Sequence, residues 1–198
     1  MRYVALGDSY TIGTSVAPAD RWPDQLVRAL GTAEPTLRLV ANLAVNGYTS
    51  ADLIRGELPA VAALEPGFVT VLIGVNDVVR RVPLERYAAN VETILETVLA
   101  LLPGERIMTI STPDYTVTPA GADHGDPDDQ HDGIVAVNAA LAGLATDRGI
   151  AHVDIFDLSL RAATDRRLVA RDGLHPSGAQ YATWVERMLP VVERLLGR

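Results

Sequence analysis

Short apolar runs alternate with stretches of helical periodicity along the whole chain, and this alternation restricts the possible folds more than any other feature. The apolar runs predict strands at 3–6, 37–43, 68–73, 106–110 and 151–155. The periodic stretches predict helices at 23–30, from 50 towards 64, at 84–102, around 138–146 and at 176–196. No hairpin signal joins two strands. We therefore expect an α/β fold with a five-stranded parallel sheet covered by helices on both faces.

The expected helix that starts near residue 50 carries its own start and stop signals. Ser50 is a plausible N-cap, and Pro59 should kink the helix or end it early. With 198 residues and no internal repeat or linker, the chain is expected to form one domain over 1–198.

Composition excludes several classes of function. The net charge of -8 would repel phosphate backbones, so we expect no nucleic-acid partner. Charged residues, Gly or Pro interrupt every apolar run, so no integral membrane contact is expected. The chain has no cysteine, which rules out disulfides, thiolate nucleophiles and thiolate metal sites.

The start of the chain bears on where the protein acts. The run at 3–6 is too short for the core of a signal peptide, so a cytoplasmic protein is expected. A mature secreted protein with an added Met would have the same sequence. No feature of the sequence assigns an oligomeric state.

Four polar segments follow predicted strands. Gly7-Asp8-Ser9-Tyr10 follows the first, Asn46-Gly47 the second, Gly74-Val75-Asn76-Asp77 the third, and Asp172 with His175 comes after the fifth. Ligands of such sheets bind beyond the carboxyl ends of the strands, so these segments should meet at one edge. Together they supply a hydroxyl, a base, an acid and oxyanion donors, which predicts a serine hydrolase.

His175 is the best candidate for the base that Ser9 needs. Asp172 precedes it by three residues, and in a tight turn a carboxylate at that spacing can hold one ring nitrogen while the other faces the serine. On its own segment, His175 could equally be a structural residue before Pro176. Of the other histidines, His152 is expected to be a hydrogen-bonded strand residue, whereas 124 and 131 fall in an acidic loop.

Ser9 and its predicted partners also have simpler interpretations. A Gly-Asp-Ser turn can cap a helix or cradle a phosphate, although the chain lacks the glycine-rich phosphate motifs. The backbone N–H groups of Ser9 and Gly47 and the amide of Asn76 would form an oxyanion hole, but Asn-Gly is often an ordinary turn. Asp77 is expected to fix the geometry of its loop.

The four segments, in this order, resemble the blocks of the SGNH hydrolases, also called the GDSL esterase/lipase family, from residue 3 to about 185. Ser9 matches the nucleophile, Gly47 and Asn76 the next two blocks, and Asp172 with His175 the last. The resemblance implies a three-layer, flavodoxin-like α/β/α sandwich and ester hydrolysis through an acyl-enzyme, without a cofactor. Tyr10 stands where the family's name has Leu, a difference that bears on specificity.

Two further features are weighed from the sequence. Tyr10 and Trp22 flank the Ser9 turn and are candidates to bind substrate, with core packing as the alternative for Trp22. The segment 113–133 has no periodicity and carries six Asp and two His, which favours a solvated loop bordering the site over a calcium site. We expect no metal.

The predicted function is hydrolysis of small or lipid-like carboxylic esters. An acyltransferase would use the same acyl-enzyme with an alcohol in place of water. The non-enzymatic alternative is an α/β module that binds a ligand through the same side chains without turnover.

Overall fold

Five parallel strands form a single sheet in the order β2-β1-β3-β4-β5, in a computed structural model that describes residues 1–198. The strands are β1 (Arg2–Gly7), β2 (Arg38–Asn42), β3 (Phe68–Leu72), β4 (Ile107–Ile110) and β5 (Ala151–Val153). Between β1 and β3, Tyr3 pairs with Phe68 and Gly7 with Leu72. The sheet and all five predicted strands are confirmed, with ends shifted by one or two residues.

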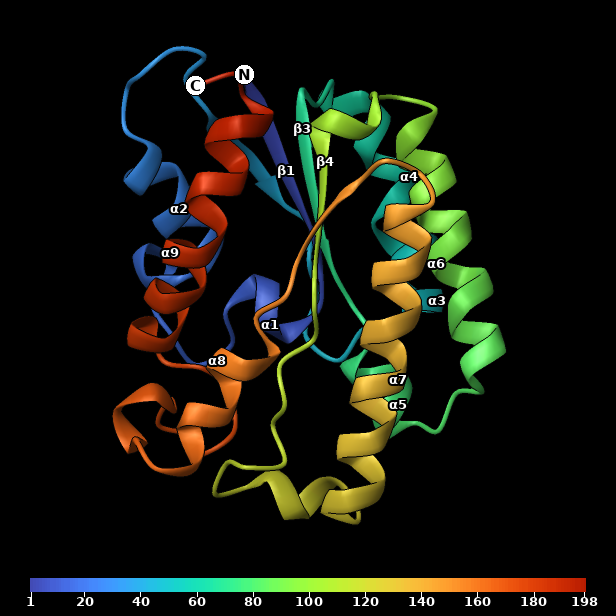
Figure 1. The fold of residues 1–198 in the computed structure, drawn as a ribbon, viewed down its shortest axis with the longest axis vertical. Coiled ribbons are helices and arrows are strands. Elements are labelled where there is room, and N and C mark those ends of the chain that lie inside the picture. Colours follow the sequence, from blue (N-terminus) through green and yellow to red (C-terminus); the bar gives the residue numbers. More distant parts are fainter.

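Helices cover both faces of this sheet and make three layers (Figure 1). The helices are α1 (Ser9–Ile12), α2 (Trp22–Leu30), α3 (Ser50–Gly56), α4 (Leu58–Val61), α5 (Val75–Val79), α6 (Leu84–Leu99), α7 (Pro127–Thr146), α8 (Phe156–Leu160) and α9 (Gly178–Leu195). The pair α2 and α9 packs on one face, and α3, α4, α6 and α7 pack on the other. The predicted α/β/α sandwich is confirmed.

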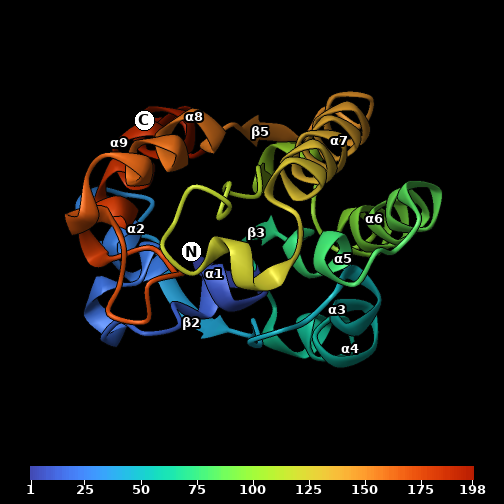
Figure 2. The same cartoon turned by 90° about the horizontal axis from the view of Figure 1, so that it is seen from below.

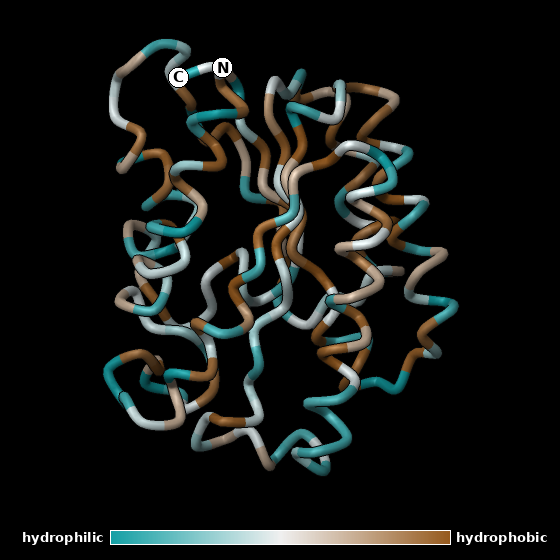
Figure 3. Tube along the Cα trace, viewed as in Figure 1, coloured by the Kyte–Doolittle hydropathy of each residue, from teal (hydrophilic) through white to brown (hydrophobic).

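The sheet lies at the centre of the core because its central strands are largely apolar and buried. Tyr3, Val4, Ala5 and Leu6 of β1 are all 0% exposed, as expected for a strand covered on both faces. They belong to one cluster of 42 buried residues that joins the sheet to the inner faces of the helices. In Figure 3 the central strands are largely brown, whereas teal gathers in the loops.

The helix predicted from residue 50 towards 64 is broken into two. The chain turns at Glu57, so that α3 ends at Gly56 and Pro59 stands in the first turn of α4, where a missing N–H costs nothing. The predicted cap is wrong by one residue. Thr49 accepts the N–H of Asp52, and the Asp52 carboxylate accepts the N–H of Thr49, a reciprocal capping box.

The prediction of a loop over 113–133 is wrong in its last third. Helix α7 starts at Pro127, with the Asp126 side chain accepting the N–H groups of Asp128 and Asp129. Its first two turns are polar and mostly exposed, so they show no apolar periodicity. The segment from β4 to α7 runs along the lower edge of the sheet, as Figure 2 shows from below.

Three short helices that periodicity did not predict lie at the carboxyl ends of strands. Helices α1, α5 and α8 follow β1, β3 and β5 and have only four or five residues each. The chain passes from β1 to β2 on one side and returns to β3 on the other, so the strand order reverses at β1. Such a switch point is where ligands bind in open α/β sheets. No helix is both long and apolar enough to cross a lipid bilayer.

Candidate active site

A sharp turn at the end of β1 presents Ser9. Gly7 has φ +151, and a Cβ there would lie 2.3 Å from the carbonyl oxygen of Leu72, so only glycine fits. Asp8 then caps α1 by accepting the N–H of Tyr10 at 3.0 Å. Ser9 is therefore the first residue of a helix, at the rim of the sheet, and is 5% exposed.

Asp172 and His175 are joined in a tight turn before α9. Asp172 Oδ1 accepts the N–H groups of Leu174 at 2.9 Å and His175 at 3.0 Å, and its Oδ2 lies 2.6 Å from His175 Nδ1. The Ser15 hydroxyl donates to the same Oδ2 at 2.5 Å. The spacing of three residues thus lets one carboxylate bind both the backbone and the ring of the histidine.

These hydrogen bonds set the charge of Asp172. Partial burial opposes its ionisation, but the donors from Ser15, Leu174 and His175 outweigh burial and lower the pKa of Asp172 to about 2. The carboxylate is therefore ionised at neutral pH and fixes the orientation of the His175 ring.

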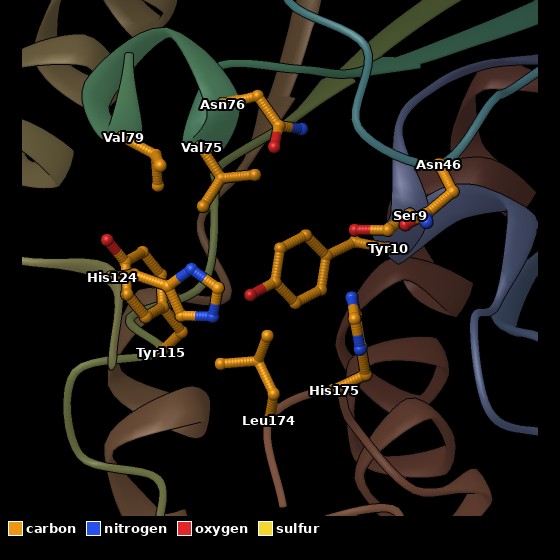
Figure 4. Close-up of a pocket in the computed structure, with 10 residues that line it drawn as sticks. All are labelled: Ser9, Tyr10, Asn46, Val75, Asn76, Val79, Tyr115, His124, Leu174 and His175. Atoms are coloured by element: carbon orange, nitrogen blue, oxygen red, sulfur yellow. The ribbon is translucent and has the colours of Figure 1, made fainter. Parts of the chain in front are cut away.

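Ser9, Asn76 and His175 line one cavity of about 220 Å³. Its other lining residues are Tyr10, Asn46, Val75, Val79, Tyr115, His124 and Leu174. Figure 4 shows the imidazole of His175 extending from α9's side of the cavity toward the Ser9 side chain. The structure thus brings together the three side chains that the sequence placed at separate strand ends.

Of the three predicted oxyanion donors, Ser9 and Asn76 line the cavity, whereas Gly47 lies next to the lining residue Asn46 and does not line it. Asn76 Nδ2 donates one hydrogen to the Tyr48 carbonyl at 2.9 Å, which holds the amide in place and leaves its second hydrogen available. The backbone N–H groups of Ser9 and Gly47 have no acceptor in the protein. Gly47 has φ +80, a conformation that favours glycine, and its carbonyl accepts from Arg80 at 2.7 Å.

The apolar part of the cavity lining was not predicted from the sequence. Val75 and Val79 come from α5, one helical turn apart, and Leu174 comes from the Asp172 turn. The two valines at i and i+4 were a usable signal, since they directly follow Gly74. Tyr115 and His124 come from the segment between β4 and α7, where no motif indicates a role.

Tyr10 lies in the cavity, as expected for a substrate-binding residue. Its ring lies 5.5 Å from that of His175, and its hydroxyl points into the open space with no hydrogen bond to the protein (Figure 4). Trp22 does not reach the cavity. It is 0% exposed and belongs to the core cluster, so core packing, the alternative weighed for it, describes its place.

The other histidines and acidic residues have separate partners. His152 contacts Thr109 at 2.9 Å, and His131 contacts the buried Asp114 at 2.6 Å. Asp77 accepts both the N–H and the hydroxyl of Ser50, which fixes the start of α3 beside α5. No group of three or more His, Asp or Glu side chains is arranged to hold a metal ion.

Comparison with known proteins gives the family. The GDSL-like lipase/acylhydrolase family matches residues 5–183, whereas no curated protein matches the sequence. The structure is similar to that of TesA, at 19% identity and a TM-score of 0.78, over 98% of this chain and 99% of that one. A lipolytic G-D-S-L family protein from Veillonella parvula has a TM-score of 0.78 at 16% identity, over 98% and 99% of the two chains.

A third similar structure is Axe2, an acetylxylan esterase from Geobacillus stearothermophilus, with a TM-score of 0.72 and 20% identity, over 100% of this chain and 94% of that one. At these identities the likeness shows a shared fold. The family match extends over most of the chain, from within β1 to within α9, and spans all four segments of the cavity. The chain therefore belongs to the GDSL-like lipase/acylhydrolase family, the SGNH hydrolases.

Proposed function

We propose that this protein is a serine hydrolase that cleaves carboxylic esters through an acyl-enzyme, with Ser9 as nucleophile, His175 as base and Asp172 as the acid that orients it. One observation carries the proposal. The hydroxyl, the imidazole and the amide of Asn76 converge on one cavity, and the imidazole is held by an ionised carboxylate at 2.6 Å.

The first half of the reaction forms the acyl-enzyme. His175 Nε2 takes the proton of Ser9 Oγ as that oxygen attacks the ester carbonyl carbon. Negative charge develops on the carbonyl oxygen, where the N–H groups of Ser9 and Gly47 and the Asn76 amide can donate hydrogen bonds. The tetrahedral intermediate then breaks its bond to the alcohol oxygen, which takes the proton from His175 and leaves.

The second half repeats these steps with water. His175 takes a proton from water, the hydroxide oxygen attacks the acyl carbon, and Ser9 Oγ leaves with the proton from His175. The products are a carboxylic acid and an alcohol. Asp172 stays ionised throughout, because its hydrogen bonds favour the carboxylate, and it stabilises the imidazolium that forms twice per cycle.

The size and lining of the cavity favour short acyl groups. The cavity that holds Ser9 and His175 has a volume of about 220 Å³. Val75, Val79 and Leu174 supply an apolar wall for the chain, while the Tyr10 hydroxyl offers one polar contact. We therefore expect esters of about two to six acyl carbons to be the best substrates.

A panel of chromogenic esters that differ only in acyl length tests this proposal. The wild-type protein should hydrolyse the short members, and Ser9→Ala should retain the fold and lose nearly all of that activity. Turnover by a folded Ser9→Ala protein would contradict the role of Ser9. A wild-type protein that turns over no ester and is not labelled by a fluorophosphonate would support the ligand-binding alternative.

The same assay separates hydrolysis from acyl transfer. With a competing alcohol present, a hydrolase releases mainly the free acid, whereas an acyltransferase forms mainly the new ester. We expect the free acid. Predominant formation of the new ester would make acyl transfer the reaction of the Ser9 acyl-enzyme.

A further inference from the structure

Three buried oxygens beneath the Ser9 turn have no hydrogen-bond partner. They are Asp8 Oδ2, Thr11 Oγ1 and Glu57 Oε1, and all three residues are nearly inaccessible to solvent, at 0%, 0% and 1% exposure. Buried polar atoms in native proteins are nearly always paired, because an unpaired one costs about 1–3 kcal/mol. Such a group beside the candidate nucleophile requires an explanation.

Glu57 reaches this turn from the break between α3 and α4. Its Oε2 accepts the N–H of Gly7 at 2.9 Å, so its carboxyl group lies against the residue that precedes Asp8 and Ser9. The carbonyl of Gly7 is also hydrogen-bonded. It accepts the N–H of Val45, which lies in the loop that carries Gly47. One glycine therefore links the nucleophile turn to Glu57 and to the predicted oxyanion loop.

The surroundings of Glu57 favour its neutral form. Burial raises the pKa of Glu57 to about 9, with the nearby Asp8 adding to the effect, and burial raises the pKa of Asp8 to about 8. Asp77 on α5 also raises the pKa of Asp8, and the nearby titratable groups on other helices are Tyr10 on α1, Tyr87 on α6 and Tyr181 on α9, whose pKa values Asp8 raises. None of these is a cation, so nothing compensates a pair of buried carboxylates.

We propose that Glu57 is a positioning residue for Ser9: as a neutral acid it accepts the Gly7 N–H through Oε2 and donates the hydrogen on Oε1 to the unpaired Oδ2 of Asp8. A neutral carboxyl has one acceptor and one donor on adjacent atoms, which the unpaired oxygens require. A Glu57 carboxylate would leave its Oε1 and Asp8 Oδ2 as two buried acceptors with no donor between them. This inference rests on the proposed function, because it concerns the placement of the proposed nucleophile.

The consequence for activity follows from how strictly a nucleophile must be placed. Misplacement of a reacting group by about 1 Å can cost about 10²-fold in rate. Without Glu57 the Gly7 N–H loses its acceptor. The turn that carries Ser9 then keeps the hydrogen bond from Val45 to the Gly7 carbonyl but loses the one from the Gly7 N–H to Glu57. The loss should appear in kcat rather than in KM, since Glu57 lies below the turn and does not line the cavity.

The test compares Glu57→Gln, Glu57→Ala and the control Glu186→Gln, which removes an exposed carboxylate on α9. Glutamine keeps a neutral acceptor and donor, so Glu57→Gln should retain kcat within about threefold, whereas Glu57→Ala should lose about 10- to 100-fold with KM little changed. Wild-type kcat in Glu57→Ala, or an equal loss in both Glu57 variants, would overturn the inference. Ser9→Ala is assayed in parallel. If it remains active, the proposed function fails instead.

Infrared difference spectra provide a readout that is independent of turnover and of how stable the alanine variant is. At pH 7 the carbonyl band of a protonated carboxyl should be stronger in the wild-type protein than in Glu57→Gln, and unchanged in Glu186→Gln. Equal bands in the wild type and Glu57→Gln would show that Glu57 is ionised and would overturn the inference.

Discussion

Asn76 is the one proposed oxyanion donor that is a side chain, and its position is fixed from outside the cavity. The bond from Nδ2 to the Tyr48 carbonyl uses one amide hydrogen and leaves the other free for a ligand in the cavity that Asn76 lines. Donors that are held in place before the reaction stabilise developing charge without reorganisation. The residue should therefore affect the transition state more than substrate binding.

Asn76→Ala should lower kcat by about 10²- to 10³-fold, equivalent to about 3–4 kcal/mol, while KM changes much less. Steady-state kinetics on a short-chain chromogenic ester measure both constants. Normal kcat with a raised KM would mean that Asn76 only binds substrate.

Asp172 is the hydrogen-bond partner of His175 Nδ1, so its removal should be costly. Asp172→Asn should lower kcat/KM by about 10²- to 10⁴-fold, since an amide can stabilise the wrong tautomer and cannot balance an imidazolium. Because the pKa of Asp172 is about 2, its ionisation should contribute no acid limb to the activity of the wild-type protein between pH 5 and 9. Activity of Asp172→Asn near that of the wild type across this range would contradict the pairing.

At the scale of elements, the segment between β4 and α7 completes the cavity. Tyr115 and His124 pack edge to face, with ring centroids 5.7 Å apart, and Asp114 at its start is tied to His131 on α7. This segment closes the end of the cavity opposite His175 (Figure 4). It should therefore limit the length of the acyl chain.

His124→Ala should shift preference toward longer acyl chains by removing part of this end wall. The ratio of kcat/KM for octanoate over acetate esters should rise by about fourfold for each CH₂ group that becomes buried, since one buried CH₂ is worth about 0.8 kcal/mol. His152→Ala, outside the cavity, should leave the ratio unchanged. A ratio unchanged in both variants would place the acyl chain elsewhere.

Elements whose sequence shows their burial could be predicted, and short or polar ones could not. Strands β1 and β3 are largely apolar because helices cover both faces, so their sequences alone reveal them. Helices α1 and α5 span barely one turn, too short to show a period. The start of α7 had a usable signal, Asp126 followed by Pro127 and two further Asp, which is typical of a helix N-terminus.

The same contrast holds for the site. Ser9, Asp172 and His175 occur in short motifs whose spacing reflects local geometry, so their proximity could be expected from the order of strands. Tyr115 and His124 reach the cavity only because the segment after β4 folds back over the sheet edge. No local pattern in the sequence predicts that path. Trp22 shows the opposite case: it is near Ser9 in the sequence, but its side chain is buried in the core.

At the scale of the whole molecule, the buried acids make stability depend on pH. The pKa values of Asp8 and Glu57 are raised to about 8 and about 9 in the folded protein, whereas unfolded carboxyls titrate near 4. The folded state therefore binds more protons than the unfolded state, and the associated stability is full below about pH 4 and lost as pH rises toward 9. The lowered pKa of Asp172 has the opposite effect on stability. Its stabilising contribution is present above about pH 4 and is lost as pH falls towards 2.

The urea midpoint of the wild-type protein should accordingly fall between pH 5 and pH 9, and Glu57→Gln should reduce that fall. Unfolding followed by circular dichroism at several pH values measures it, with Glu186→Gln as control. Parallel curves for the wild type and Glu57→Gln would show that Glu57 does not bind a proton on folding.

The identity of the nucleophile is the central claim, and active-site labelling tests it most directly. After reaction with a fluorophosphonate, peptide mass spectrometry of the wild-type protein should locate one adduct per molecule, on Ser9, with loss of esterase activity in proportion to labelling. Ser15→Ala, which removes a neighbouring hydroxyl but keeps Ser9, should be labelled at the same residue. A stoichiometric adduct on any residue other than Ser9, or full esterase activity after complete labelling of Ser9, would contradict the proposed mechanism.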